Sequence, residues 1–186
     1  MWSRDMTVRR LIRLATAMTI AGMAGACFQP LYGERTLAGG SALREALAAV
    51  DVDQIKAPKG TALSRIAVET RNELVFDLTG GSGSAPPTHR LAIHLVPTAH
   101  TVILDPLTQR PEFDDFGLDA YFTLVEIGSG KTVMNGQAAT RVTYNVPGQQ
   151  QRFARSRALR DAETRAAKVV ADQIRSRLAS YFVAGT

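Results

Sequence analysis

The chain has 186 residues, which allows one domain or at most two small ones. Hydrophobic residues make up 45% and charged residues 21%, an ordinary globular composition that excludes collagen-like, coiled-coil and wholly disordered chains. Lysine and arginine number 22 against 17 acidic residues, so the formal net charge is +5. The single cysteine, Cys27, excludes a disulfide framework and a multi-cysteine zinc site within one chain.

The first 26 residues have the layout of a secretory signal peptide. Four arginines and one aspartate lie near the start, and an uncharged, mostly apolar stretch then runs from Leu14 to Ala26. This stretch is too short for a transmembrane helix, which needs roughly 20 apolar residues. We therefore predict that residues 1–26 are removed, which leaves 18 basic against 16 acidic residues. The remaining charge no longer favours nucleic-acid binding.

The end of this segment, Ala24-Gly25-Ala26-Cys27, resembles a bacterial lipobox. The resemblance implies that the Cys27 thiol receives diacylglycerol and that this residue becomes the new N-terminus. Two or three acyl chains give a stable membrane anchor. The alternative is an incidental or buried cysteine after an ordinary signal peptide, but a unique cysteine at the end of the apolar run argues against coincidence. Phe28, where an aspartate would signal inner-membrane retention, is compatible with export to the outer membrane.

The mature chain is predicted to begin with a lipidated tether over residues 27–40, which has three glycines and no clear period. A single domain over 41–186 follows. It opens with a short helix over 41–49, with Ser41 as N-cap, and a strand over 50–55. Pro58-Lys59-Gly60 breaks the chain before a helix over 61–78, whose apolar residues recur every three or four positions. Gly80-Gly81 is predicted to end this helix.

Three strand-like segments come after a glycine-rich loop over 79–88. Apolar and polar residues alternate over 89–96, which can continue beyond Pro97 through 101–104, and again over 118–127 and 132–146. Gly128-Ser129-Gly130 predicts a hairpin turn between the last two segments. A long helix is predicted over 154–182, with Asp161 and Arg165 as a surface pair four residues apart.

The order of these elements predicts an α+β fold. Strands and helices do not alternate as in βαβ units, so we expect an antiparallel sheet of about four strands. Two helices, 61–78 and 154–182, are expected to pack on one face of it as a two-layer sandwich.

No catalytic or metal-binding constellation is found in the sequence. Gly130-Lys131-Thr132 resembles the end of a phosphate-binding loop, but Val125 stands where the pattern needs glycine, and a strand follows in place of a helix. Solvent-facing strand positions are the better interpretation for His89, His94 and His100. We therefore expect a chain that is not an enzyme and holds no metal or cofactor.

The run from Cys27 to Gly33, CFQPLYG, resembles the start of the mature LPS-assembly lipoprotein LptE in its alphaproteobacterial form. Residues 71–95 and 142–174 resemble the same family, so the resemblance spans most of 27–182. It implies an outer-membrane lipoprotein, without enzymatic activity, that lies inside the lumen of the LptD β-barrel. Such a protein helps the barrel to assemble and binds lipopolysaccharide (LPS); nucleic acid is not an expected partner.

Two other interpretations stay open on the residues alone. One is an unrelated envelope lipoprotein that acts as a scaffold or a small-ligand-binding module, and the other is a periplasmic lipoprotein enzyme. A stable complex with a large barrel protein separates the LptE-like interpretation from both.

The candidate site residues come from the predicted sheet. Its face away from the helices is expected to hold Tyr121, Thr123 and Arg141, and this face and the 128–131 turn are predicted to contact LptD. The phosphates and acidic sugars of LPS favour basic side chains on strands or loops. The candidates are Arg90, Arg110, Lys131 and Arg141, each of which is alternatively a solvated surface charge. Lys131 and Arg141 are preferred because one hairpin would present both.

Overall fold

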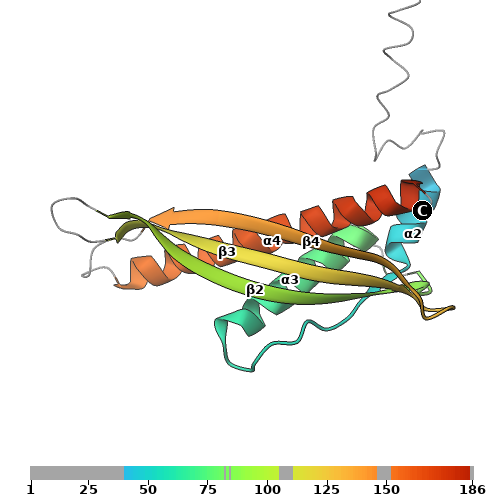
Figure 1. Cartoon of the computed structure of the whole chain (residues 1–186), viewed down its shortest axis with the longest axis horizontal. Coiled ribbons are helices and arrows are strands. Elements are labelled where there is room, and N and C mark those ends of the chain that lie inside the picture. Colours follow the sequence, from blue (N-terminus) through green and yellow to red (C-terminus); the bar gives the residue numbers. More distant parts are fainter. Residues whose placement is uncertain (1–39, 82, 84, 105–110, 146–151, 185–186) are drawn as a thin grey trace, which may run out of the picture. The chain divides into compact units, whose positions relative to one another are not determined.

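The computed structural model describes residues 40–81, 83, 85–104, 111–145 and 152–184 (Figure 1). The predicted signal peptide, the lipidation site Cys27 and the candidate Arg110 lie outside the described residues. A compact unit runs from Ser41 to Thr186. The elements in chain order are α2 (Gly40–Ala48), β1 (Val50–Val52), α3 (Ala62–Thr79), β2 (His89–Leu104), β3 (Pro111–Glu126), β4 (Thr132–Asn145) and α4 (Arg152–Ala184).

The four described strands form one mixed sheet in the order β1-β2-β3-β4. β2, β3 and β4 are antiparallel neighbours, whereas β1 pairs in parallel with β2 and places Val50 opposite His89. The α+β class and the four strands are confirmed, but the expectation of a wholly antiparallel sheet is wrong at β1. Two parallel neighbours need a crossover of a dozen or more residues, and α3 provides it.

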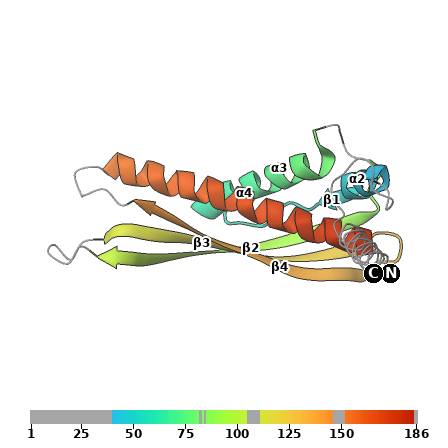
Figure 2. The same ribbon diagram turned by 90° about the horizontal axis from the view of Figure 1, so that it is seen from above.

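The helices form the second layer, and Figure 2 shows α3 and α4 on the same side of the sheet. α4 packs against β3 and β4, and α3 packs mainly against α4. Two packed helices were expected, but the described residues form three. The additional helix is α2, which contributes buried Leu43 and Leu47 to the same core. The short helix predicted over 41–49 is therefore part of the packed domain.

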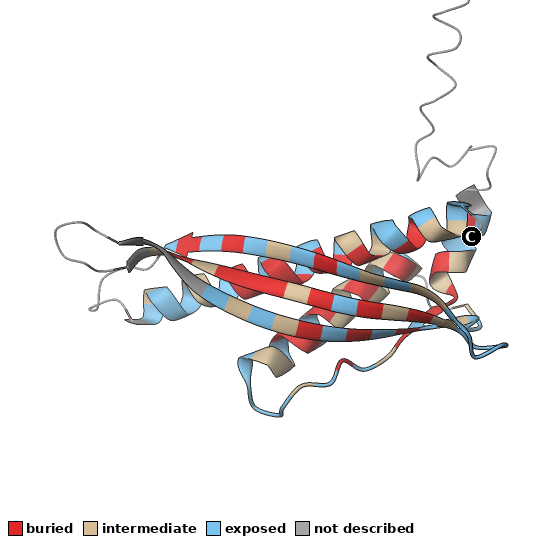
Figure 3. Cartoon of the chain, viewed as in Figure 1, coloured by how far each residue is buried: buried red, intermediate tan, exposed pale blue. Residues whose placement is uncertain are grey.

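The core lies between the sheet and the helices. Its largest fully buried apolar side chains come from α3, from the inner face of β2 and β3, and from α4: Leu74, Leu91, Leu118, Leu124, Val170, Ile174 and Leu178. Alanines on α4 are fully buried as well, so this helix lies close to the sheet. Burial alternates along the strands, as Figure 3 shows, because successive strand side chains point to opposite faces.

The ends of α3 follow from local sequence. The Thr61 side chain accepts a hydrogen bond from the amide of Ser64 at 3.3 Å, which caps the first turn. Gly80 adopts a left-handed conformation with φ of 62°, and its amide donates to the carbonyl of Phe76 at 2.8 Å. The predicted glycine stop is thus confirmed. The conformation is one that glycine adopts at little cost.

β3 begins at Pro111, seven residues before the predicted start at 118. The alternation of apolar and polar residues fails in this stretch because Asp114 is a buried, charged residue on the inner face. Gly117, on the outer face, has no side chain to contribute to the pattern. The first part of β3 therefore does not show the alternation of a strand, because its inner face contains the carboxylate of Asp114, which pairs with Arg155 of α4 at 3.2 Å.

Candidate functional site

The sheet face opposite α3 and α4 is left uncovered by the described elements (Figure 2). Strand alternation and register place mainly polar and small side chains on this open face. They are Arg90, Ala92, His94, Val96 and Thr98 of β2, Asp115, Gly117, Asp119, Tyr121, Thr123 and Val125 of β3, and Asn135, Gln137, Ala139, Arg141 and Thr143 of β4. The prediction that Tyr121, Thr123 and Arg141 lie away from the helices is met by this arrangement.

Cross-strand hydrogen bonds link β3 to β4 on the open face. Thr123 Oγ1 donates to Asn135 Oδ1 at 3.0 Å, Thr143 Oγ1 donates to Asp115 Oδ1 at 2.6 Å, and Arg141 Nη1 donates to Asp119 Oδ1 at 3.0 Å. Such pairs stabilise neighbouring strands and fix their register. These side chains are therefore already engaged within the domain.

Arg141 lies across Gly117 to reach Asp119. Its Nη1 and Nη2 lie 3.0 and 3.4 Å from the two carboxylate oxygens of Asp119. A Cβ at Gly117 would lie 2.9 Å from Arg141 Cδ and would collide with the Thr98 hydroxyl, so glycine makes room for the guanidinium. The hydrogen bond to Asp119 raises the pKa of Arg141. The arginine is charged, but its charge faces an acidic partner.

The middle of the open face holds a row of three polar side chains without partners. His94 of β2 is opposite Tyr121 of β3, which in turn is opposite Gln137 of β4. All three are exposed, Tyr121 to 52%, and within the described part of the chain none of them makes a side-chain hydrogen bond or ion pair. This row, the central row, is the part of the face with unused hydrogen-bonding capacity next to an exposed aromatic ring.

The β3–β4 connection is a tight turn, as predicted. The amide of Gly130 donates to the carbonyl of Glu126 at 2.9 Å, and the Ser129 hydroxyl donates to the Glu126 carboxylate. Lys131 is exposed beside this turn, and β4 starts at the next residue. Gly130-Lys131-Thr132 thus closes a hairpin, as predicted, and is followed by a strand and not by the helix of a phosphate-binding loop.

The structure does not bring Lys131 and Arg141 together. They are ten positions apart on one extended segment, which corresponds to about 33 Å at about 3.3 Å per residue. Arg90 instead lies at the hairpin end of the open face, where it is opposite Val125 and pairs with Asp53 at 3.6 Å. Among the described strand residues, the arginine closest to Lys131 in register is therefore Arg90 on β2 and not Arg141 on β4.

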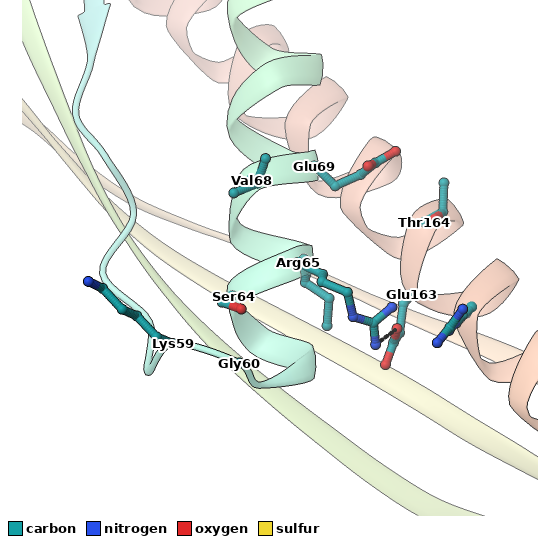
Figure 4. A pocket seen from close by; sticks show the side chains of 10 residues that line it. Lys59, Gly60, Ser64, Arg65, Val68, Glu69, Glu163 and Thr164 are labelled. Carbon is teal, nitrogen blue, oxygen red and sulfur yellow. Dashed lines mark hydrogen bonds and ion pairs between the residues drawn. The ribbon is translucent and has the colours of Figure 1, made fainter.

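Two adjoining hollows on the helix side have no counterpart in the sequence analysis. One, of about 600 Å³, lies between α3 and α4, where Arg65 Nη2 contacts Glu163 Oε2 at 3.2 Å (Figure 4). The other, of about 740 Å³, lies between residues 54–59 and α3, and Lys56, Lys59 and Arg71 line it. The residues of each hollow come from separate segments of the fold and lie in no recognisable motif, so only their spatial arrangement reveals them.

Neither a metal cluster nor a membrane span is present in the described ranges. No three or more His, Cys, Asp or Glu side chains converge there in a way that could hold a metal ion. Among the described helices, none is both long and apolar enough to cross a membrane.

Solved structures of lipoproteins share this fold. A Caulobacter crescentus protein described as a lipoprotein is 19% identical with a TM-score of 0.60, covering 78% of this chain and 98% of its own. Rare lipoprotein B from Shewanella oneidensis is 17% identical with a TM-score of 0.50, covering 73% and 96%. Lipoprotein B from Nitrosomonas europaea is 11% identical with a TM-score of 0.53, covering 74% and 90%. The chain matches no protein-family model and no curated protein.

Proposed function

We propose that this chain is a lipid-anchored outer-membrane protein that binds inside the LptD β-barrel and assists the assembly of LPS at the cell surface. In this role it is a barrel plug and assembly factor and a component that binds LPS. The observation on which the proposal depends is the one-sided domain, with helices on one face of the sheet and a polar, uncovered face on the other. The resemblance of residues 27–182 to the LptE family and the lipoproteins that share the fold support it.

The open face suits a barrel lumen for a chemical reason. The interior of an outer-membrane barrel is polar, because lumen-facing and lipid-facing residues alternate along each strand. A partner for such a wall needs hydrogen-bonding groups and few large apolar side chains. The central row of His94, Tyr121 and Gln137 offers unused donors and acceptors, and Tyr121 adds an aromatic ring, a residue type enriched at interfaces.

The predicted anchor is consistent with this placement. Twelve residues separate Cys27 from Gly40, where α2 begins, and this length spans at most about 47 Å when extended. Acyl chains on Cys27 would hold the domain in the same membrane as the barrel. The proposal assigns the anchor to localisation and the folded domain to recognition.

Site-specific photo-crosslinking in cells tests the orientation. We expect a photoreactive residue at Tyr121, at Arg141 or in the 128–131 turn to capture LptD. Matched positions on the outward face of α4, Val169 and Arg177, are exposed and serve as controls. Crosslinks from the helix positions alone would overturn the orientation, and no LptD adduct from any position would overturn the partner.

Charge reversal tests the LPS role separately. We expect the double variant K131E/R141E to fold and to bind LPS more weakly than the wild type. LPS binding is measured without LptD, because both residues lie on the surface proposed to contact the barrel. Because Arg141 pairs with Asp119, D119N is the control that breaks the same pair and keeps the cation. Unchanged LPS binding of K131E/R141E at low salt, where screening is least, would return both residues to ordinary surface charges.

A further inference from the structure

A basic groove lies on the helix side of the sheet, away from the open face. Residues 54–59 form one wall and the first three turns of α3 form the other, around a volume of about 740 Å³. This volume falls within the range of small-molecule sites, which is about 300–1,000 Å³. We call it the α3 groove.

The charge of the α3 groove is of one sign. Lys56, Lys59 and Arg71 line it, and its described lining includes no aspartate or glutamate. None of the three makes an ion pair with a carboxylate in the part of the chain that the structure describes. Arg71 Nε donates to the carbonyl of Val52 at 3.0 Å, which fixes the start of the guanidinium and leaves its Nη atoms for another acceptor.

The hollow on the other side of α3 provides an internal contrast. There Arg65 contacts Glu163 at 3.2 Å, and Glu69, Arg160 and Lys59 line the same hollow. Figure 4 shows the side chain of Lys59 pointing away from the Arg65–Glu163 pair. The hollow between α3 and α4 shares Lys59 with the α3 groove but also contains two glutamates. The charged side chains that line the α3 groove are all basic, which favours an anion there.

The α3 groove also has apolar walls. Ile55 and Ala67 are buried at 6% and 3% exposure, and Val68 is 57% exposed at the rim. Inorganic phosphate would contact the cations and leave the exposed Val68 side chain in water. A ligand with a phosphate joined to a hydrocarbon segment matches both parts, because burial of each CH₂ group adds favourable free energy.

We infer that the α3 groove binds the phosphate-bearing head group of an anionic glycerophospholipid, with the first carbons of its chains against Val68. Lys56 and Lys59 contact the phosphate as point charges, and Arg71 donates hydrogen bonds to its oxygens. The inference concerns a different face from the one proposed for LptD and LPS. It does not depend on barrel binding.

Titration of the full chain in a nonionic detergent tests the inference. The ligands are short-chain phosphatidylglycerol and phosphatidylcholine with the same acyl chains, with heats measured by calorimetry at low salt. We expect the wild type to bind the anionic lipid about tenfold more tightly, and K56Q/K59Q to lose about tenfold in affinity, since charge-assisted contacts are lost. The matched control R157Q/R177Q removes two exposed arginines of α4 outside the groove and is expected to bind as the wild type does.

Two further arms separate the lipid from other occupants. V68S is expected to weaken phosphatidylglycerol binding and to leave any binding of inorganic phosphate unchanged. Displacement of the lipid by an equal concentration of inorganic phosphate would overturn the lipid assignment, as would equal affinity for phosphatidylcholine. Wild-type affinity in a correctly folded K56Q/K59Q variant, checked by circular dichroism, would overturn the site itself. Capture of LptD from Tyr121 is measured on the same variants, so failure of the inference and failure of the proposed function are distinguishable.

Discussion

Gln173 of α4 makes two hydrogen bonds to the backbone of Ala139 at the outer edge of β4. Its Nε2 donates to the Ala139 carbonyl at 3.2 Å, and its Oε1 accepts from the Ala139 amide at 3.1 Å. A side-chain amide thus takes the place of a neighbouring strand at this position. An unpaired sheet edge is a template for pairing with another chain, so Gln173 both ties α4 to the sheet and blocks part of this edge.

We expect Q173A to lower the free energy of unfolding by about 1 kcal/mol, since two partly exposed hydrogen bonds are lost. Self-association should also increase, because the Ala139 amide and carbonyl become free at the edge. Urea unfolding measures the first effect and analytical ultracentrifugation the second. Q137A, which removes an exposed glutamine with no described partner, is the control, and equal behaviour of the two variants would contradict the edge role.

Gly136 lies opposite Phe122 in the β3–β4 register, and the buried phenyl ring lies over it. A Cβ at this position would collide with the ring, which cannot move within a packed core. We expect G136A to lower the free energy of unfolding by about 2 kcal/mol, in the range for overpacked sites. G128A, in a turn with nothing within 4 Å of an added Cβ, is the control and should stay close to the wild type. A small effect of G136A would show that the ring can shift.

The Arg65–Glu163 pair joins α3 to α4 with unequal burial. The Arg65 side chain is 52% exposed and that of Glu163 is 7% exposed. R65Q leaves a buried carboxylate without its cation, whereas E163Q leaves an arginine that reaches solvent. We expect R65Q to lower the free energy of unfolding by about 1 to 2 kcal/mol and E163Q by less than about 1 kcal/mol, with the exposure of Arg65 limiting both. Urea unfolding at neutral pH measures both, and the reverse order would contradict this argument.

Tyr144 adds a pH dependence at high pH. Burial raises its pKa above the ordinary 10.0, and the nearby carboxylate of Asp114 raises it further. The folded state therefore holds the phenol proton more tightly than the unfolded state does. The stability associated with this proton is fully present below pH 10 and is lost as pH rises through the raised pKa. We expect Y144F to lose less stability than the wild type above pH 10, measured by urea unfolding; parallel pH curves would contradict the assignment.

Lipidation of Cys27 is a prediction from sequence alone. We expect C27S to accumulate as an unprocessed or soluble precursor without acyl chains, because the acceptor thiol is absent. Mass spectrometry of the mature wild-type chain measures the expected acyl mass on this residue directly. A mature chain without that mass would contradict the prediction and remove the membrane anchor from the proposed function.

Local sequence determined most of the elements. The three-and-four spacing of apolar residues gave the helix at 61–78, and Gly80 ended it one residue beyond the predicted boundary. The alternation of apolar and polar residues predicted β2 and β4, and the glycine-containing turn at 128–130 predicted the hairpin between β3 and β4. The predicted Asp161–Arg165 pair is present at 2.8 Å. These features depend on residues within a few positions of one another, so they can be predicted from the local sequence.

Tertiary structure decided what depends on distant partners. The parallel pairing of β1 with β2 follows from α3 crossing the helix side of the sheet, which no local pattern encodes. Asp114 is buried on β3 because Arg155, from α4, lies 3.2 Å from its Oδ2. The α3 groove exists because the chain after β1 returns alongside α3 and places Lys56 and Lys59 near Arg71. Charged residues on different segments acquire their role only through packing, which decides whether a residue lies beside an opposite charge or lines a groove without one.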